Sequence, residues 1–262
     1  MYGLRKRGSR GSTKTEYISY MARRRFFVDA VQSGRARITG PDAHHLTRGL
    51  RVEPGQQFEI SDNHSGYLAE VESARKDLVS FVVQERLAAA EPLVRTTLLA
   101  SLVRFERFEW IIEKATELGV EQIIPLETER TEKGLRKAAE KRSVRWNRIA
   151  REASEQSRRV RLPEIHVAVG LADALAIECD YRYLLDEAQG AAPPMLSVLS
   201  SSRRTGDSIA LLLGPEGGWT DREREMITGA GWCAVSLGHE ILRAETAAIA
   251  GLAIINAAWN TI

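Results

Sequence analysis

The hydrophobic pattern of this chain changes near Glu91-Pro92, and this change constrains the fold more than any other feature. Before it, short runs of alternating apolar and polar residues are separated by turn signals such as Gly40-Pro41. After it, apolar runs typical of strands alternate with stretches of helical periodicity. The first pattern is typical of a small barrel or sandwich, and the second of a parallel α/β sheet. The sequence therefore predicts a β domain over 21–90 and an α/β domain over 93–262.

Individual elements can be predicted in the second part. The run SIALLLG is apolar throughout, as expected of a strand that is covered on both faces of a parallel sheet. Gly119 fits the residue after a helix end, and Thr220 with Glu223 has the spacing of a capping box. We expect strands over 94–103, 120–126, 181–186, 208–214 and 233–238, and helices over 104–119, 137–158 and 245–259. In the first part, Asp42 is a plausible N-cap of one short helix.

Composition excludes several classes of protein. Residues 1–20 are basic, polar and without apolar periodicity, so we expect a disordered tail or an extension ahead of a natural start at Met21. The 2 cysteines argue against a disulfide framework or a structural zinc site, and they favour a reducing cytoplasm. No apolar run approaches the roughly 20 residues that span a bilayer. We therefore expect neither a membrane nor a metal as partner.

Positive charge is concentrated in two regions of a nearly neutral chain. Residues 1–51 contain 12 Lys+Arg and 3 Asp+Glu, a net charge of +9, whereas the remaining residues contain 25 and 32, a net charge of −7. Residues 127–161 add 12 Lys+Arg against 6 acids. Such regions suit a polyanionic partner, and they are equally typical of solvated helix faces and a flexible tail.

The stretch LLLGPEGGWTDRERE, residues 211–225, places a glycine-rich loop after a predicted strand. The loop lacks the lysine of a P-loop and the glycine spacing of a dinucleotide fingerprint, and Glu216 would repel a phosphate. Gly217 and Gly218 allow close backbone approach and positive φ. A ligand with hydroxyl and amino donors and a cation, such as S-adenosylmethionine, suits this loop. A tight turn held together by Glu216 suits it equally well.

A second loop of similar kind follows one unit later, in SLGHEILRAETAA, residues 236–248. Ligands of parallel sheets bind outside the carboxyl ends of the strands, so two such loops predict one shared pocket. Arg243 and Glu245 stand just before an apolar helix. They are candidates for chemistry, although an exposed cation and a helix-start acid would also explain them.

These two motifs together resemble the C-terminal motifs of the RsmE family, the 16S ribosomal RNA uracil-N3 methyltransferases of the SPOUT class. The resemblance extends upstream through FEWIIEKATELGVEQIIPLETERT (108–131) and RWNRIAREASEQSRRVRLPEI (145–165). It also includes RRRFFVD and HHLTRGLRVEPGQQFEISD, which resemble the family's N-terminal PUA-like β-barrel. It covers about 23–260 and implies a trefoil-knotted α/β methyltransferase domain, a homodimer, S-adenosylmethionine as cofactor, and 16S rRNA within the small ribosomal subunit as substrate.

The resemblance also assigns residues. It implies a cofactor site formed by Leu185, Leu213, Gly214, Glu216, Gly217, Gly218, Leu237, Gly238, Ile241 and Leu242. Arg243 is the candidate to stabilise a developing uracil anion, and Glu245 either accepts the proton or orients Arg243. The RNA contacts are expected from Arg23, Arg24, Arg25, Arg48, Arg51, Arg158 and Arg159. The alternatives are a different RNA base as target, or an rRNA-binding module without catalysis.

Overall fold

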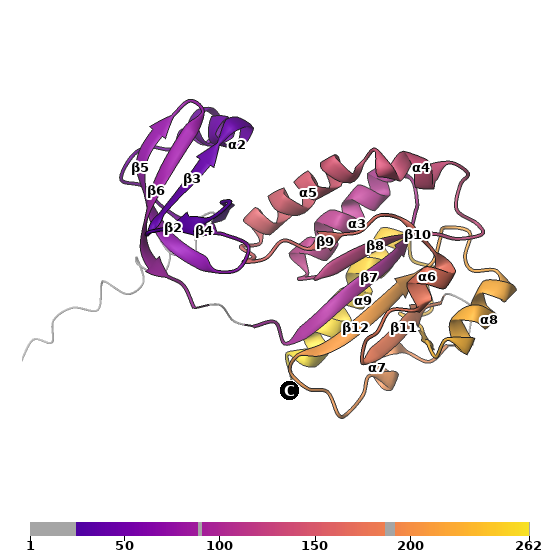
Figure 1. Ribbon diagram of the computed structural model, residues 1–262. Coiled ribbons are helices and arrows are strands. Elements are labelled where there is room, and N and C mark those ends of the chain that lie inside the picture. The colour runs from indigo at the N-terminus through magenta and orange to yellow at the C-terminus, as the bar shows by residue number, and fades with distance from the viewer. Residues whose placement is uncertain (1–24, 89–90, 187–191, 262) are drawn as a thin grey trace, which may run out of the picture. The chain divides into compact units, whose positions relative to one another are not determined.

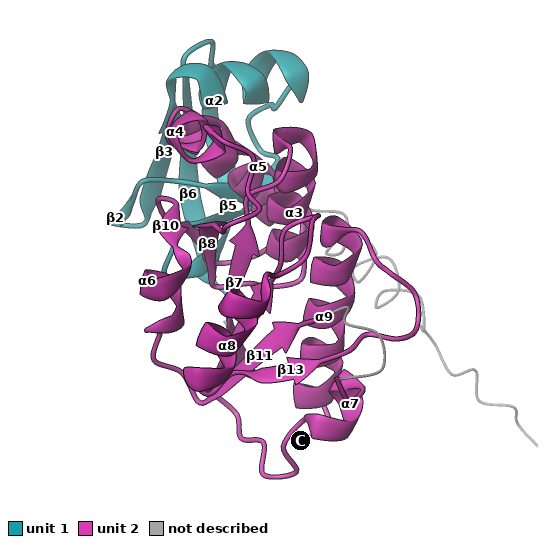
Figure 2. Ribbon diagram, turned by 90° about the vertical axis from the view of Figure 1, so that its right-hand side faces the viewer, with its two compact units in different colours: residues 1–89 teal, residues 90–262 magenta. Residues whose placement is uncertain are grey.

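The computed structural model describes residues 25–88, 91–186 and 192–261, so the tail expected over 1–20 lies outside the described residues. The chain divides into two compact units, residues 1–89 and 90–262 (Figure 2). This division lies beside the change in hydrophobic pattern at Glu91-Pro92. Each unit has its own buried core. None of the described helices is long and apolar enough to cross a membrane.

The first unit contains a six-stranded sheet in the order β1-β4-β5-β6-β3-β2. β1 pairs with β4 in parallel, the other neighbouring strands are antiparallel, and two register shifts between β5 and β6 bend the sheet. The elements are β1 (Arg25–Phe27), β2 (Val31–Gln32), β3 (Arg35–Thr39), α2 (Gly40–His44), the single π-helical turn η1 (His45–Gly49), β4 (Gln57–Ser61), β5 (Gly66–Arg75) and β6 (Leu78–Arg86). The N-cap of α2 is Thr39, so the prediction for Asp42, which lies in the first turn, is wrong.

The second unit contains a parallel sheet in the order β10-β8-β7-β12-β11-β13, and β9 also pairs with β8. Its strands are β7 (Val94–Ser101), β8 (Gln122–Glu127), β9 (Glu164–Ile165), β10 (Val169–Gly170), β11 (Tyr181–Leu185), β12 (Asp207–Leu213) and β13 (Cys233–Val235). Its helices are α3 (Phe105–Glu117), α4 (Leu135–Glu140), α5 (Ser143–Gln156), α6 (Leu171–Leu175), α7 (Met195–Val198), α8 (Asp221–Gly229) and α9 (Ala244–Trp259).

Helices cover both faces of this sheet, which explains the apolar run of β12. Ile209, Leu211 and Leu213 contact the core that is shared with α3, α5 and α9, whereas Ala210 and Leu212 face α6 and α8 (Figure 1). Alternate residues of the strand therefore pack into two different cores, one on each face of the sheet. The predicted strand with two covered faces is confirmed.

Most predicted elements of the second unit are confirmed, and the long basic helix is the exception. Residues 137–158 fall into two helices, because the chain leaves α4 at Lys141 and begins α5 after Arg142. Arg142 pairs with Glu109 at 3.1 Å and lies over the Phe105 ring at 4.7 Å. These contacts to α3 join residues distant in the sequence, so helical periodicity could not indicate the break.

Candidate functional site

The end of β11, together with the loops that follow β12 and β13, lines one cavity of about 430 Å³ at the carboxyl ends of these strands. Nine of the ten predicted cofactor residues line it: Leu185, Leu213, Gly214, Glu216, Gly218, Leu237, Gly238, Ile241 and Leu242. Arg243 lines it as well, whereas Gly217 and Glu245 do not. The two glycine loops therefore form one pocket, and Gly217 has to be removed from the set of lining residues.

The first loop is a tight turn built on its glycines and on Trp219. The Gly218 amide donates to the Pro215 carbonyl at 2.8 Å, which places Glu216 and Gly217 at the corners of the turn. Gly218 has a φ of +68°, which favours glycine. A Cβ on Gly214 would lie 2.8 Å from Nε1 of the buried Trp219. Gly214 is required by this close packing, and Gly218 by its backbone conformation.

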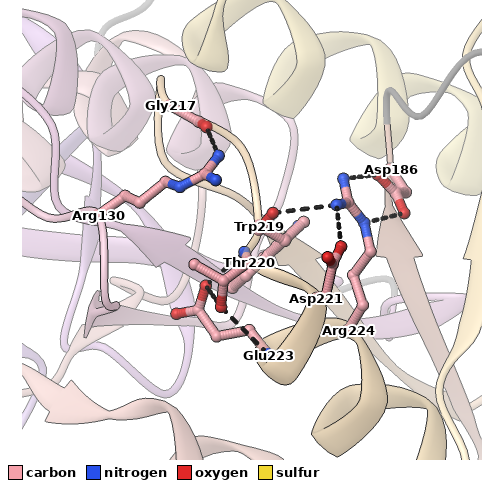
Figure 3. A network of polar contacts seen from close by, with 8 residues as sticks. All are labelled: Arg130, Asp186, Gly217, Trp219, Thr220, Asp221, Glu223 and Arg224. Atoms are coloured by element: carbon pink, nitrogen blue, oxygen red, sulfur yellow. Dashed lines mark hydrogen bonds and ion pairs between the residues drawn. The ribbon is translucent and has the colours of Figure 1, made fainter.

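Two arginines from other elements hold the turn. Arg107, in the first turns of α3, forms an ion pair with Glu216, and both side chains are partly exposed. Arg130, in the segment between β8 and α4, donates to the Gly217 carbonyl (Figure 3). Its side chain also occupies the space beside Gly217, where a Cβ would lie 3.3 Å from Arg130 Cδ. Gly217 therefore faces Arg130, and the Glu216 carboxylate is bound to a cation.

The start of α8 is fixed by the predicted capping box, which is confirmed. Thr220 Oγ1 accepts from the Glu223 amide at 3.2 Å, and Glu223 Oε2 accepts from the Thr220 amide at 2.9 Å (Figure 3). Glu223 is buried, and its second oxygen accepts from the Glu129 amide at 2.8 Å. One carboxylate therefore joins the loop after β12 to the segment after β8.

A second ion pair anchors the end of β11 against α8. Arg224 donates from Nε and Nη2 to the two oxygens of Asp186, each at 3.0 Å, and from Nη1 to the Trp219 carbonyl at 3.0 Å (Figure 3). The Asp186 side chain is 8% exposed, and the residue lines the cavity. A bidentate pair of this kind fixes the geometry of the wall behind the cavity.

The second loop leads into α9 and carries the candidate catalytic residues. Gly238 has a φ of +143°, and its amide donates to Ser236 Oγ at 3.2 Å. Arg243 is the N-cap residue of α9, is exposed, and forms no ion pair with the residues that the structure describes. Glu245 is buried, and its Oε2 has no hydrogen-bond partner within the described residues. No ion pair joins Arg243 to Glu245 in this part of the chain.

Sequence reasoning missed several residues that line the cavity. They come from α3, from strand ends, from the turns themselves and from the first turn of α9: Arg107, Asp186, Pro215, Trp219, Val235, Ser236, Glu240, Ala244 and Ala247. Arg107 is separated from Glu216 by more than 100 positions, so only the fold reveals the pair. Trp219 directly follows the glycine loop, and its adjacency was the one available clue. No group of acidic, histidine or cysteine residues suited to a metal occurs among the described residues.

Two of the predicted RNA-binding arginines have structural roles instead. Arg25 is buried and pairs with Glu59 at 2.7 Å inside the first unit, so it cannot reach a phosphate. Arg159 donates to the Thr116 carbonyl at 2.8 Å, and burial lowers the pKa of its guanidinium to about 10. Arg48 and Arg51 are exposed, and Arg158 is half-buried. Arg23 and Arg24 lie outside the described residues.

Comparisons with known proteins agree with the geometry. The RNA methyltransferase domain family matches residues 89–256, and the RNA methyltransferase PUA domain family matches residues 38–84. The ribosomal RNA small subunit methyltransferase E of Bacillus subtilis is 34% identical over 228 residues, which cover 84% of this chain and 88% of that protein. Its counterpart from Synechocystis is 34% identical over 233 residues, which cover 84% of this chain and 72% of that protein.

Solved structures agree as well. The ribosomal RNA small subunit methyltransferase E of Neisseria gonorrhoeae, crystallised with S-adenosyl methionine, has a TM-score of 0.79 and 28% identity, and the match covers 90% of this chain and 98% of that one. A methyltransferase of Legionella pneumophila in complex with the same cofactor has a TM-score of 0.80 and 27% identity, with 90% and 98% covered. The chain therefore belongs to the family of ribosomal RNA small subunit methyltransferase E, an RNA methyltransferase domain preceded by a PUA domain.

Proposed function

We propose that this protein transfers a methyl group from S-adenosylmethionine to N3 of a uridine in 16S rRNA of the small ribosomal subunit, in the cytoplasm. The observation that carries the proposal is the cavity at the ends of β11, β12 and β13, with the exposed Arg243 on its lining, in a chain of this family. The site belongs to the second unit alone.

The cavity suits this cofactor in size and in chemistry. Its volume of about 430 Å³ lies within the range of small-molecule sites. Leucines and Trp219 provide apolar walls, and the glycine turns bring backbone groups to the surface. Three carboxylates and two guanidinium groups line it, namely Asp186, Glu216, Glu240, Arg107 and Arg243. Of the two guanidinium groups on the described lining, Arg107 is already paired with Glu216, and the carboxylate oxygens suit a ligand that carries a sulfonium and hydroxyl donors.

In the balanced reaction the N3–carbon bond forms as the sulfur–methyl bond breaks, S-adenosylhomocysteine leaves, and the weakly acidic N3 proton passes to solvent. S-adenosylmethionine, when bound, supplies a methyl group on a positively charged sulfur. Arg243 has no ion-pair partner in the described part of the chain, so its guanidinium is available to donate to a uracil carbonyl. There it stabilises the negative charge that develops on the imide as the proton leaves.

Glu245 is better explained as a positioning residue than as the base. It does not line the cavity, and its buried side chain has no route to the uracil through the described lining. It lies in the first turn of α9, where the helix dipole favours a carboxylate. We assign it the role of stabilising the helix start that presents Arg243. Glu245→Gln should then lower thermal stability and reduce kcat less than Arg243→Ala does.

The proposal is tested first at Arg243. Arg243→Ala should lower kcat about 100- to 1000-fold, as the loss of a preorganised donor does elsewhere, while the Kd for S-adenosylmethionine in calorimetry changes less than about twofold. Arg222→Ala, which removes an exposed arginine from α8, is the matched control and should keep normal turnover. Unchanged turnover in Arg243→Ala would remove this residue from the mechanism.

The target base is tested in cells. Mass mapping of 16S rRNA from a deletion strain should lack one N3-methyluridine, which the wild-type gene restores and the Arg243→Ala gene does not. A missing methyl group on another base would change the substrate and leave the enzyme class intact. An unchanged rRNA methylation pattern, together with binding to small subunits, would indicate a binding module without catalysis.

We propose that the protein is a homodimer that uses an apolar face of α9. Ala253 and Ala257 are exposed, and Ile249 is half-buried on this helix, although its composition predicts burial nearly all round. On α3, which packs against α9, Trp110 is 60% exposed. Ala253→Glu and Trp110→Glu should each produce monomers in light scattering. Val144→Glu, at an apolar residue of α5 that is 82% exposed, is the control and should remain dimeric.

We also propose the trefoil knot and the RNA contacts. β12 and β13 lie on opposite sides of β11, and α9 returns to pack on β12, which is a chain path that a knot would use.

In the first unit, Arg48→Gln/Arg51→Gln should reduce the slope of log affinity for a 16S rRNA transcript against log salt concentration by about 1.4 to 1.8. Arg148→Gln/Arg151→Gln removes the same charge from arginines paired within α5, and should alter the slope less.

A further inference from the structure

The charged groups that line the cavity differ in how they are engaged. Asp186 is bound by Arg224 through two hydrogen bonds, and Arg243 has the proposed role toward the target base. Glu240 is exposed on the second loop. Among the described lining residues, the ion pair between Arg107 and Glu216 is the one that joins two members of the lining. The Arg107 side chain is 35% exposed and the Glu216 side chain 44%. A ligand in the cavity can therefore reach both partners of one ion pair.

We propose that Arg107 and Glu216 together form the receptor for the amino-acid end of S-adenosylmethionine, an inference that rests on the proposed function. That end carries an ammonium and a carboxylate on one carbon atom. An arginine and a glutamate in direct contact match such a zwitterion, since Arg107 receives the carboxylate in bidentate fashion and Glu216 receives the ammonium. The ligand then replaces part of the internal ion pair, so neither charge is left without a counter-charge.

The surroundings of the pair separate ligand recognition from loop support. The turn that carries Glu216 is also held by its internal hydrogen bond between Gly218 and Pro215 and by Arg130 at the Gly217 carbonyl. Arg130 supports the same turn and does not line the cavity. Because an exposed ion pair adds little to stability, Arg107 is not needed to hold a turn that already has two other supports. Its position on the cavity is better explained by the ligand.

The experiment titrates three ligands into each variant by calorimetry. S-adenosylmethionine carries both charges, decarboxylated S-adenosylmethionine keeps only the ammonium of the amino-acid end, and 5′-methylthioadenosine lacks that end altogether. Arg107→Gln should weaken the first ligand about 10- to 100-fold and leave the other two within about twofold. Glu216→Gln should weaken the first two ligands and spare the third. Arg130→Gln is the matched control and should affect all three ligands by the same factor.

Three outcomes would overturn the inference. Equal losses for all three ligands in Arg107→Gln would make Arg107 a support of the turn, like Arg130, and unchanged binding would remove it from the site. If Arg107→Gln unfolds by circular dichroism, Arg107→Lys replaces it and should show the same ligand ranking with smaller losses; any other ranking contradicts the proposal. Failure of the wild-type protein to bind any of the three ligands would instead refute the proposed function.

Discussion

Gly214→Ala tests whether the close packing of the glycine loop is as tight as it looks. The added Cβ would lie 2.8 Å from Trp219 Nε1 and 3.0 Å from Cε2, whereas carbon atoms in contact are normally about 3.5–4.0 Å apart. Trp219 is 2% exposed and packs in a core with Ile227 and Trp232, so the indole cannot simply turn away. Overpacking of this kind costs about 1–3 kcal/mol. Reduced freedom of the unfolded chain returns about 0.4–1 kcal/mol, which leaves a net loss of about 1–2 kcal/mol.

The measurement is the free energy of unfolding in urea, with Gly229→Ala as the matched control. Gly229 lies at the end of α8, and a Cβ there would meet nothing within 4 Å, so alanine should stabilise by up to about 1 kcal/mol through helix propensity. Trp219→Phe in the Gly214→Ala background should recover part of the loss, with a coupling energy above about 0.5 kcal/mol. Equal stabilities of the two alanine variants would refute the packing argument, as would strict additivity with Trp219→Phe.

Three further predictions concern buried or paired side chains, and each is measured by urea denaturation. Glu223→Ala should lower the free energy of unfolding by about 2–3 kcal/mol, because the backbone amides of Glu129 and Thr220 lose their hydrogen-bond acceptor. Glu225→Ala, at an exposed position of the same helix, should leave the free energy of unfolding nearly unchanged. The hydrogen bond from Arg145 holds the pKa of Glu109 below its usual range. The free energy of unfolding of Glu109→Gln should therefore be about 1–2 kcal/mol below that of the wild type at pH 7. That difference should shrink as the pH falls from 4.5 through the lowered pKa, and a constant difference would contradict it. Burial raises the pKa of Tyr183 from 10.0 to about 12. Between these two pH values the wild type should therefore lose free energy of unfolding relative to Tyr183→Phe by about 1.4 kcal/mol per pH unit, and parallel pH profiles would count against this.

Local patterns in the sequence were enough for the framework and for most of the pocket. The alternation of apolar strands with amphipathic helices predicted the parallel sheet, and Gly119 marked a helix end that does have a positive φ of +85°. The capping box at Thr220 formed as its spacing indicates. The two glycine loops follow β12 and β13, which flank β11 in the parallel sheet, and loops at the carboxyl ends of parallel strands converge. Nine of the ten residues that the family resemblance assigned to the cofactor lie on the lining of this cavity.

The tertiary structure decided which of the charged and glycine residues have which role. Whether Arg25 reaches a phosphate or lies buried depends on Glu59, 34 positions away. Whether Glu216 is free depends on Arg107, 109 positions away. Gly217 and Gly218 are adjacent and identical in kind, yet Arg130 occupies the space beside one while the other lines the cavity. Periodicity and capping report interactions within a few residues of the chain, whereas ion pairs, burial and the shape of a pocket arise between segments that only folding brings together.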